Sequence, residues 1–74
     1  MSNRKEGNMV NGRKIKDLMV EKGIQGNEMA QTVGVSETMM SYILRGLREP
    51  NVAILARIAR VLDVTVDELI VKEG

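Results

Sequence analysis

The feature that most restricts the fold of this chain is a link of three residues, Gly34, Val35 and Ser36, between two short aliphatic stripes. Each stripe has the spacing of one face of an amphipathic helix, at about 100° per residue. Glycine is frequent just after a helix and serine is a frequent N-cap, so we expect helices over 26–33 and 36–45 with a tight turn between them. The stripes consist of Met29, Ala30 and Val33, and of Met39, Met40, Ile43 and Leu44.

Polar caps predict three further helices. Asparagine is a strong N-cap, and Asn11 and Asn51 each precede a stripe of apolar residues with helical spacing. A Thr-x-x-Glu capping box, formed by Thr65 and Glu68, opens a last short helix that ends near residue 71. The other two new helices run from the Asn11 cap to about residue 22 and over 52–62, so we expect a compact all-α domain of five helices over 10–72, preceded by a flexible polar tail over 1–9.

Composition limits the chemistry available to the chain. Its 74 residues include no cysteine and no histidine, which excludes disulfides and thiolate metal sites and removes the commonest catalytic base. We see no glycine-rich phosphate loop and no evident pair of catalytic carboxylates, so we expect no enzyme, no cofactor and no metal site. No stretch approaches the roughly 20 apolar residues of a membrane span. The N-terminus lacks the apolar region of a secretory signal, so we expect a cytoplasmic protein.

A short glycine-containing link between two helices is typical of the helix-turn-helix motif. Between about residues 22 and 69 the chain resembles the lambda-repressor-like, Cro and XRE family of helix-turn-helix proteins, on the segments EKGI, EMAQTVGVSETMMSYILRG, REPN and LARIARVLDVTVDEL. This resemblance implies a five-helix lambda-repressor-like domain that binds double-stranded DNA, usually as a homodimer on a near-palindromic operator. The helix over 36–45 would then enter the major groove while the helix over 26–33 crosses the DNA backbone.

The resemblance also assigns roles, by position, to polar residues in and around the helix over 36–45. Glu37 either accepts from cytosine N4 or only stabilises the helix dipole, an effect of about 0.3–1 kcal/mol. Tyr42, the single aromatic residue, either contacts a phosphate or a thymine methyl group or has no role. The candidates for reading base edges are Glu37, Thr38, Ser41 and Tyr42, and the candidates for phosphate contact are Asn27, Ser36, Arg45 and Arg48.

Glu37 is one departure from the family pattern, and two others concern Gly26 and the pair Met19 and Leu44. Many members carry a glutamine where this chain has Gly26, so we expect weaker or differently placed anchoring to the DNA backbone at this point. Many also carry an arginine and a glutamate that pair across two helices where this chain has Met19 and Leu44. Packed apolar side chains replace a buried ion pair at little or no cost, so this change should affect stability rather than function.

The charge of the chain is balanced rather than basic. The net charge of +1 divides into +3 for residues 1–24, with six basic and three acidic side chains, and −1 for each of 25–50 and 51–74. Because phosphate neutralisation supplies most non-specific affinity, one copy should bind DNA modestly, and a second copy becomes important. Apolar side chains beside the core stripes of the last two helices are candidates for a homodimer interface: Ile54, Val61, Val66 and Ile70.

These observations predict a sequence-specific, double-stranded DNA-binding transcriptional regulator, specifically a repressor of phage or mobile-element type. We expect no small-molecule effector. The alternative is a protein-interaction helix-turn-helix module such as an antitoxin or an adaptor, which the low charge and Gly26 leave open.

Overall fold

Three of the four α-helices in residues 10–71 begin where a polar side chain replaces a missing backbone partner. In the computed structural model, which describes residues 10–71, the side chains of Asn11, Ser36 and Asn51 accept from backbone N–H groups three residues further on, at 2.8–3.1 Å. These bonds satisfy donors that have no partner inside the helix. The elements are α1 (Gly12–Lys22), α2 (Gly26–Val33), α3 (Glu37–Leu44), α4 (Val52–Leu62) and a short 3-10 helix, η2 (Val66–Leu69).

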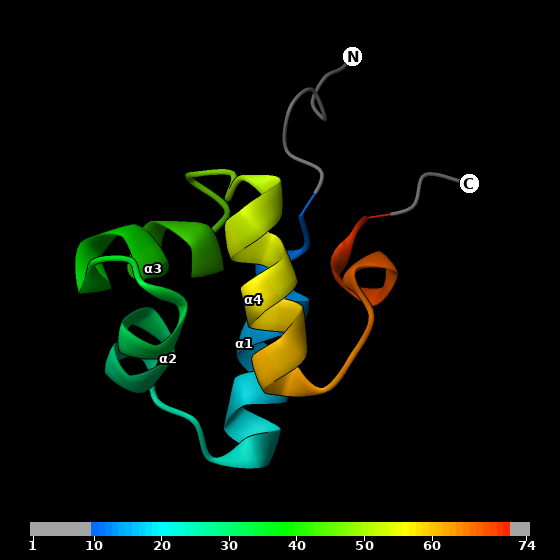
Figure 1. Cartoon of the computed structure of the whole chain (residues 1–74), viewed down its shortest axis with the longest axis horizontal. Helices are drawn as coiled ribbons and strands as arrows, with labels where there is room; N and C mark the ends of the chain where they lie inside the picture. Colours follow the sequence, from blue (N-terminus) through cyan, green and yellow to red (C-terminus); the bar gives the residue numbers. More distant parts are fainter. Residues whose placement is uncertain (1–9, 72–74) are drawn as a thin grey trace.

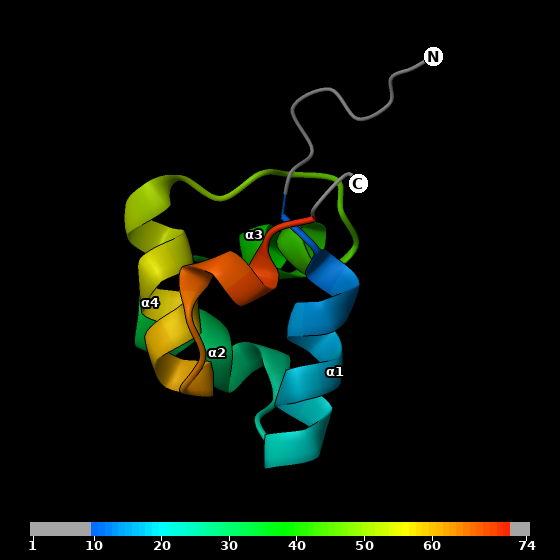
Figure 2. The ribbon, with the colours of Figure 1, turned by 90° about the vertical axis from the view of Figure 1, so that its right-hand side faces the viewer.

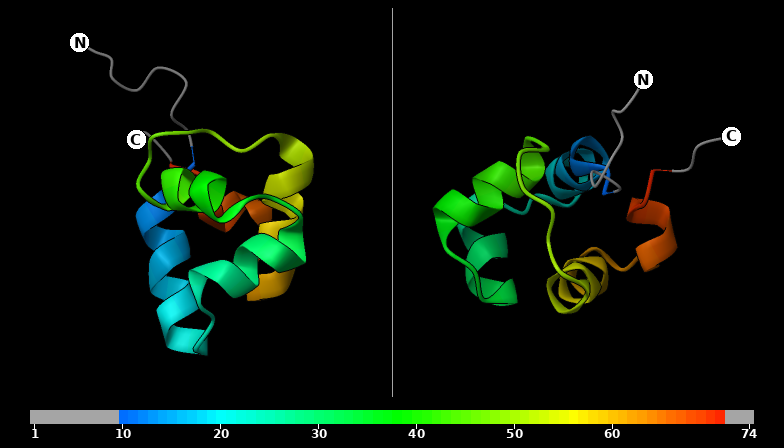
Figure 3. Two further views of the ribbon diagram at one scale, coloured as in Figure 1. Left: turned by 90° about the vertical axis from the view of Figure 1, so that its left-hand side faces the viewer. Right: turned by 90° about the horizontal axis from the view of Figure 1, so that it is seen from above.

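The helices pack around one shared core. Figure 1 shows α2 and α3 on one side of α1 and α4, with η2 on the other side, and the turned view of Figure 2 separates α1 from α4. Helix α4 packs against α1, α2 and η2, and α3 packs against α1 and α2. This arrangement leaves α3 on the outside of the molecule: it lies in front of the other helices in the left view of Figure 3 and at the left edge in the right view.

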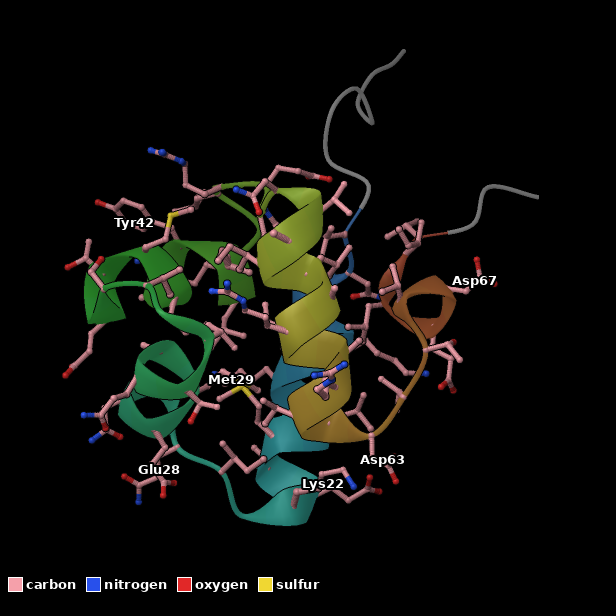
Figure 4. The ribbon with its side chains drawn as sticks, in the orientation of Figure 1. Lys22, Glu28, Met29, Tyr42, Asp63 and Asp67 are labelled. Carbon is pink, nitrogen blue, oxygen red and sulfur yellow. The ribbon has the colours of Figure 1, made fainter. Side chains whose placement is uncertain are left out.

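The core is aliphatic, as the composition predicts. Met29 points from α2 toward α1 and α4 (Figure 4) and is fully buried. In α3, Met40 and Ile43 are buried while Met39 and Leu44 are half-buried against them. The buried residues of α4 are Leu55, Ile58, Ala59 and Leu62. The largest fully buried side chains are Ile15, Met29, Val33, Met40, Ile43, Ile58, Leu62 and Leu69.

The end of the described chain differs from the prediction. The Thr65–Glu68 capping box forms, but the helix that it opens is a 3-10 helix that ends at Leu69 instead of continuing to about residue 71. Ile70 is extended and forms an antiparallel bridge with Val10, and the N–H of Asn11 donates to the Leu69 carbonyl at 2.7 Å. Pairing with the segment before α1 therefore replaces a further helical turn, and the described fold has four α-helices and one 3-10 helix.

The start of α1 agrees with the prediction, since the helix begins at Gly12 directly after the Asn11 cap. The end of α3 differs by one residue, because the helix ends at Leu44 with Arg45 as its C-cap. The predicted tail over 1–9 and the last residue of the predicted domain lie outside the described residues. Among residues 10–71, no helix has the length and apolar character needed to cross a membrane.

Candidate nucleic-acid interface

The turn between α2 and α3 sets the direction of α3. Gly34 has φ +84°, a left-handed conformation that glycine adopts without steric cost. The N–H groups of Gly34 and Val35 both donate to the Ala30 carbonyl at 2.9 Å, which closes α2. The hydroxyl of Ser36 then accepts from the Met39 N–H at 3.0 Å and opens α3. Two successive caps thus define the turn, as the sequence predicts.

Because α3 buries one face, its opposite face is exposed to solvent. This outer face consists of Glu37, Thr38, Ser41, Tyr42 and Arg45, all of which are exposed. It has a carboxylate, two hydroxyls, a phenol and a guanidinium, and therefore offers both donors and acceptors of hydrogen bonds. The four predicted base readers and one predicted phosphate contact thus share one face of one helix.

A hollow of about 350 Å³ connects this face to two other helices. Its lining includes Asn27 from the start of α2 and Lys16 from α1, beside Glu37, Ser41 and Arg45 of α3. Met40 and Leu44 contribute an apolar part of the wall. The hollow therefore unites four predicted site residues with Lys16, which is not among the predicted site residues.

A second hollow lies on the side of the turn. Its volume is about 440 Å³, and Asn27 and Glu37 line it as they line the first one. Gln31 belongs to this second hollow and is exposed, one helical turn after Asn27. This spacing on the polar side of α2 is a signal from which Gln31 could have been selected as a site residue.

Gly26 leaves space at the junction of α2 and α3. A Cβ atom placed on Gly26 would have no neighbour within 4 Å, and Gly26 itself lines the first hollow. At the start of α2, the carboxylate of Glu28 accepts from the Gln25 N–H at 2.9 Å. A Cβ atom at residue 26 would therefore fit without displacing the backbone.

The phosphate candidates occupy different environments. Arg45 lies over the Tyr42 ring, with 6.0 Å between the guanidinium carbon and the ring centre, which is at the outer limit of a cation–π contact. Tyr42 is 38% exposed and projects from the outer side of α3 (Figure 4). Arg48 is exposed in the loop after α3 and is not part of either hollow. Ser36 uses its oxygen as a helix cap, and its hydroxyl hydrogen remains to donate.

The electrostatics of this surface are mixed. Glu37 is the acidic residue of the first hollow, and Lys16 and Arg45 are its two cations. The described chain as a whole carries eight basic and eight acidic side chains. Within residues 10–71, no group of three or more acidic, cysteine or histidine side chains is placed to hold a metal ion. The lining of the first hollow therefore has an excess of one positive charge, although the described chain is neutral as a whole.

Residues 15–69 match the protein-family model described as helix-turn-helix. The chain belongs to the helix-turn-helix family. The match extends from α1 to the end of η2, so it includes the turn, the outer face of α3 and both hollows.

Several members of the helix-turn-helix family are similar to this chain in sequence. The transcriptional regulator SinR of Bacillus subtilis is 37% identical over 60 residues, which is 80% of this chain and 54% of SinR. The chain thus spans about half the length of SinR. The uncharacterised regulator YazB of Bacillus subtilis is 36% identical over 58 residues, which is 78% of this chain and 84% of YazB.

Solved structures of the family agree with the fold. SinR in complex with DNA has a TM-score of 0.72 at 37% identity, covering 78% of this chain and 94% of that one. The P22 c2 repressor in complex with a synthetic operator has a TM-score of 0.75 at 28% identity, covering 78% of this chain and 88% of that one. The fold is therefore that of the lambda-repressor-like helix-turn-helix proteins.

The departure at Met19 and Leu44 has a simple structural counterpart. Met19 is a buried member of the core and Leu44 is half-buried against that core. Both positions are thus filled by apolar side chains in apolar surroundings, where an ion pair would have to be desolvated.

Proposed function

We propose that this chain is a sequence-specific, double-stranded DNA-binding transcriptional regulator of repressor type, with α3 in the major groove. The observation that supports this proposal most is the exposed polar face of α3, whose residues share a hollow with Lys16 and Asn27. The major groove, about 12 Å wide, admits an α-helix and presents a distinct pattern of donors and acceptors for each base pair. Acting on DNA in this way places the chain in the cytoplasm.

The proposed DNA-binding residues have two different roles. Glu37, Thr38, Ser41 and Tyr42 read base edges, and Asn27, Ser36, Arg45 and Arg48 contact phosphates. Lys16 joins the second group, because it lines the same hollow as Asn27 and Arg45. Its cation and that of Arg45 offset the repulsion between Glu37 and the DNA backbone, which favours base readout by Glu37 over a role in the helix dipole alone.

Relatives support the same function. SinR and the P22 c2 repressor have each been solved in complex with DNA, and both have the fold of this chain. Direct contacts to bases supply specificity, whereas phosphate contacts supply position and most of the salt-dependent affinity. With charges balanced over residues 10–71, this chain relies on base contacts and on a second copy more than on non-specific attraction.

We place the homodimer interface at α4 and η2, on Ile54, Val61, Val66 and Ile70. Val66 is 36% exposed, whereas the other three are half-buried and pack partly against the core. A dimer that binds both half-sites of a near-palindromic operator would have a much higher affinity than one copy on one half-site. No small-molecule effector is part of this proposal.

A second candidate function is a protein-interaction module. Leu47, in the loop between α3 and α4, and Val52, the first residue of α4, are 60% and 82% exposed, and such side chains are typical of binding surfaces when they gather. A SinR structure in complex with the SinI protein also has the fold of this chain, with a TM-score of 0.73. The two functions differ in whether any DNA sequence is preferred.

Selection of binding sites from random duplex DNA tests the proposal. The wild-type chain should enrich one sequence family, and its affinity should be measured by fluorescence anisotropy over a range of salt concentrations. If Glu37 reads cytosine, Glu37→Ala should relax the preference at one base position. Arg45→Ala should weaken binding to all sequences and lower the salt slope by about one. A wild-type chain that enriches no sequence at any salt concentration would favour the protein-interaction module.

A further inference from the structure

Arg57 of α4 joins two parts of the fold that are far apart in the sequence. Its Nη1 donates to the backbone carbonyl of Val33 at 3.0 Å, across 24 residues. By contrast, the N-cap hydrogen bonds of Asn11, Ser36 and Asn51 each span three residues and lie within the first turn of one helix. The Arg57 bond instead connects α4 to the last residue of α2.

The carbonyl that Arg57 meets is one that the backbone leaves without a helical partner. Val33 ends α2, and the N–H groups of Gly34 and Val35 both turn back to Ala30. The last carbonyls of a helix carry partial negative charge, and a cation near them is favourable. A charged donor also makes a stronger hydrogen bond than a neutral one. Arg57, which belongs to α4, therefore caps the C-terminal end of α2 with its side chain.

Arg57 also lies against the turn itself. A Cβ atom on Gly34 would approach the Arg57 Nη1 to 3.3 Å, which is closer than an ordinary van der Waals contact. Gly34 is thus favoured by its positive φ, and a larger residue there would also require the guanidinium to shift by a few tenths of an ångström. The turn that leads into α3 is in this way enclosed by its own caps on one side and by Arg57 on the other.

We propose that Arg57 is a positioning residue, which fixes the turn between α2 and α3 to α4 and thereby sets the position of α3 on DNA. This inference rests on the proposed function, since it concerns how the outer face of α3 meets base edges. A shift of α3 by a fraction of a turn weakens base contacts but leaves phosphate attraction almost unchanged, because base readout depends on geometry. Arg57 should therefore affect specificity rather than general affinity.

Arg60 provides a matched control on the same helix. Arg57 and Arg60 line one shallow hollow of about 260 Å³ with Ala53 and Ala56 on the outer side of α4. Within residues 10–71 the side chain of Arg60 makes no hydrogen bond to α2. Arg57→Met and Arg60→Met therefore remove the same charge from the same helix, but only the first removes the bond to Val33.

The test has one measurement with DNA and one without. The first measurement gives the ratio of the affinity for the selected duplex to the affinity for a scrambled duplex. R57M should lower this ratio about tenfold, equivalent to about 1.4 kcal/mol, and should leave the salt slope unchanged. In the free protein, hydrogen exchange of the Val35 amide should become about tenfold faster in R57M, because that amide belongs to the turn that Arg57 holds. R60M should leave both quantities as in the wild type.

Three results would overturn the inference. A lower salt slope with an unchanged ratio would make Arg57 a phosphate contact, and equal effects of R57M and R60M would make it a general charge effect. Unchanged exchange at Val35 would show that the bond does not hold the turn. If R57M does not fold, exchange in Arg57→Lys, whose ammonium has a shorter reach and lacks the planar guanidinium, decides in the same way. A wild-type chain that prefers no DNA sequence would count against the proposed function, while the exchange measurement would still test the role of Arg57 at the turn.

Discussion

Gly12 lies so close to Ile43 that a Cβ atom on Gly12 would be 2.5 Å from the Ile43 carbonyl oxygen. The same atom would be 2.7 Å from the Leu44 carbonyl oxygen. The first turn of α1 therefore packs directly on the backbone at the end of α3, and only a glycine permits this approach. The orientation of α3 thus depends on contacts at both of its ends, with Gly12 at the C-terminal end and the turn at Gly34 at the other.

Gly12→Ala should destabilise the domain. The added methyl group meets backbone rather than a flexible side chain, so overpacking should lower the free energy of unfolding by about 1–3 kcal/mol. This loss exceeds the roughly 0.5–1 kcal/mol that alanine gains over glycine in a helix. Gly26→Ala is the control, because that position is helical and open, and it should be neutral or stabilising. Urea unfolding followed by circular dichroism measures both, and a more stable Gly12→Ala variant would contradict the packing described.

Gly26→Gln should increase affinity for DNA. The glutamine that many relatives carry at this position would extend into open space beside Asn27 and add one phosphate contact. One net hydrogen bond of about 0.5–1.5 kcal/mol corresponds to an increase of about two- to tenfold. Anisotropy titration with the selected duplex measures the change. Gly26→Ala should leave affinity unaltered, and an equal gain in both variants would assign the effect to helix stability instead.

Tyr42 and Arg45 should act as a pair. If the ring orients the guanidinium toward the DNA backbone, the two residues together contribute more to the free energy of DNA binding than the sum of their separate contributions. A double-mutant cycle with Tyr42→Ala and Arg45→Met should give a coupling energy in DNA binding of about 0.5–1 kcal/mol, the range of an exposed cation–π contact. Tyr42→Phe keeps the ring and should retain most of this coupling. Strictly additive effects of the two substitutions would show that the residues bind DNA independently.

Val66→Glu should prevent dimerisation. A charge placed in the middle of an apolar interface is costly to desolvate, whereas the same charge on a free surface is tolerated. Sedimentation equilibrium should find a dimer for the wild type and a monomer for Val66→Glu, with weaker binding to an operator that has two half-sites. Val20→Glu, at an exposed position of α1, should still dimerise. A third variant, Val52→Glu, locates the interface if the prediction is wrong. If it is the variant that sediments as a monomer, the interface lies beside the loop between α3 and α4.

Features that depend on neighbouring residues could be predicted from the sequence. Ser36 caps α3 and Gly34 ends α2 because the groups concerned lie within four residues of each other, and local spacing is sufficient to predict this. The division of α3 into a buried and an exposed face likewise follows from the period of the helix alone. This is why the outer face of α3 was predicted in full.

Features that depend on how the helices cross could not be predicted in this way. Lys16 lies beside Ser41 and Arg45 only because α1 packs against α3, and Arg57 meets Val33 only because α4 packs against α2. The last helix was predicted too long for the same reason. Whether Ile70 continues a helix or pairs with Val10 depends on where the chain before α1 lies.

The central claim is that the outer face of α3 and the hollow beside it bind DNA. The most direct measurement is a titration of the isotope-labelled chain with the selected duplex, followed by the shifts of backbone amide signals in NMR spectra. The account predicts that the largest shifts lie in α3, at the start of α2 around Asn27, and at Lys16, with small shifts in η2. Largest shifts in η2 and the facing side of α4, with α3 unaffected, would contradict it.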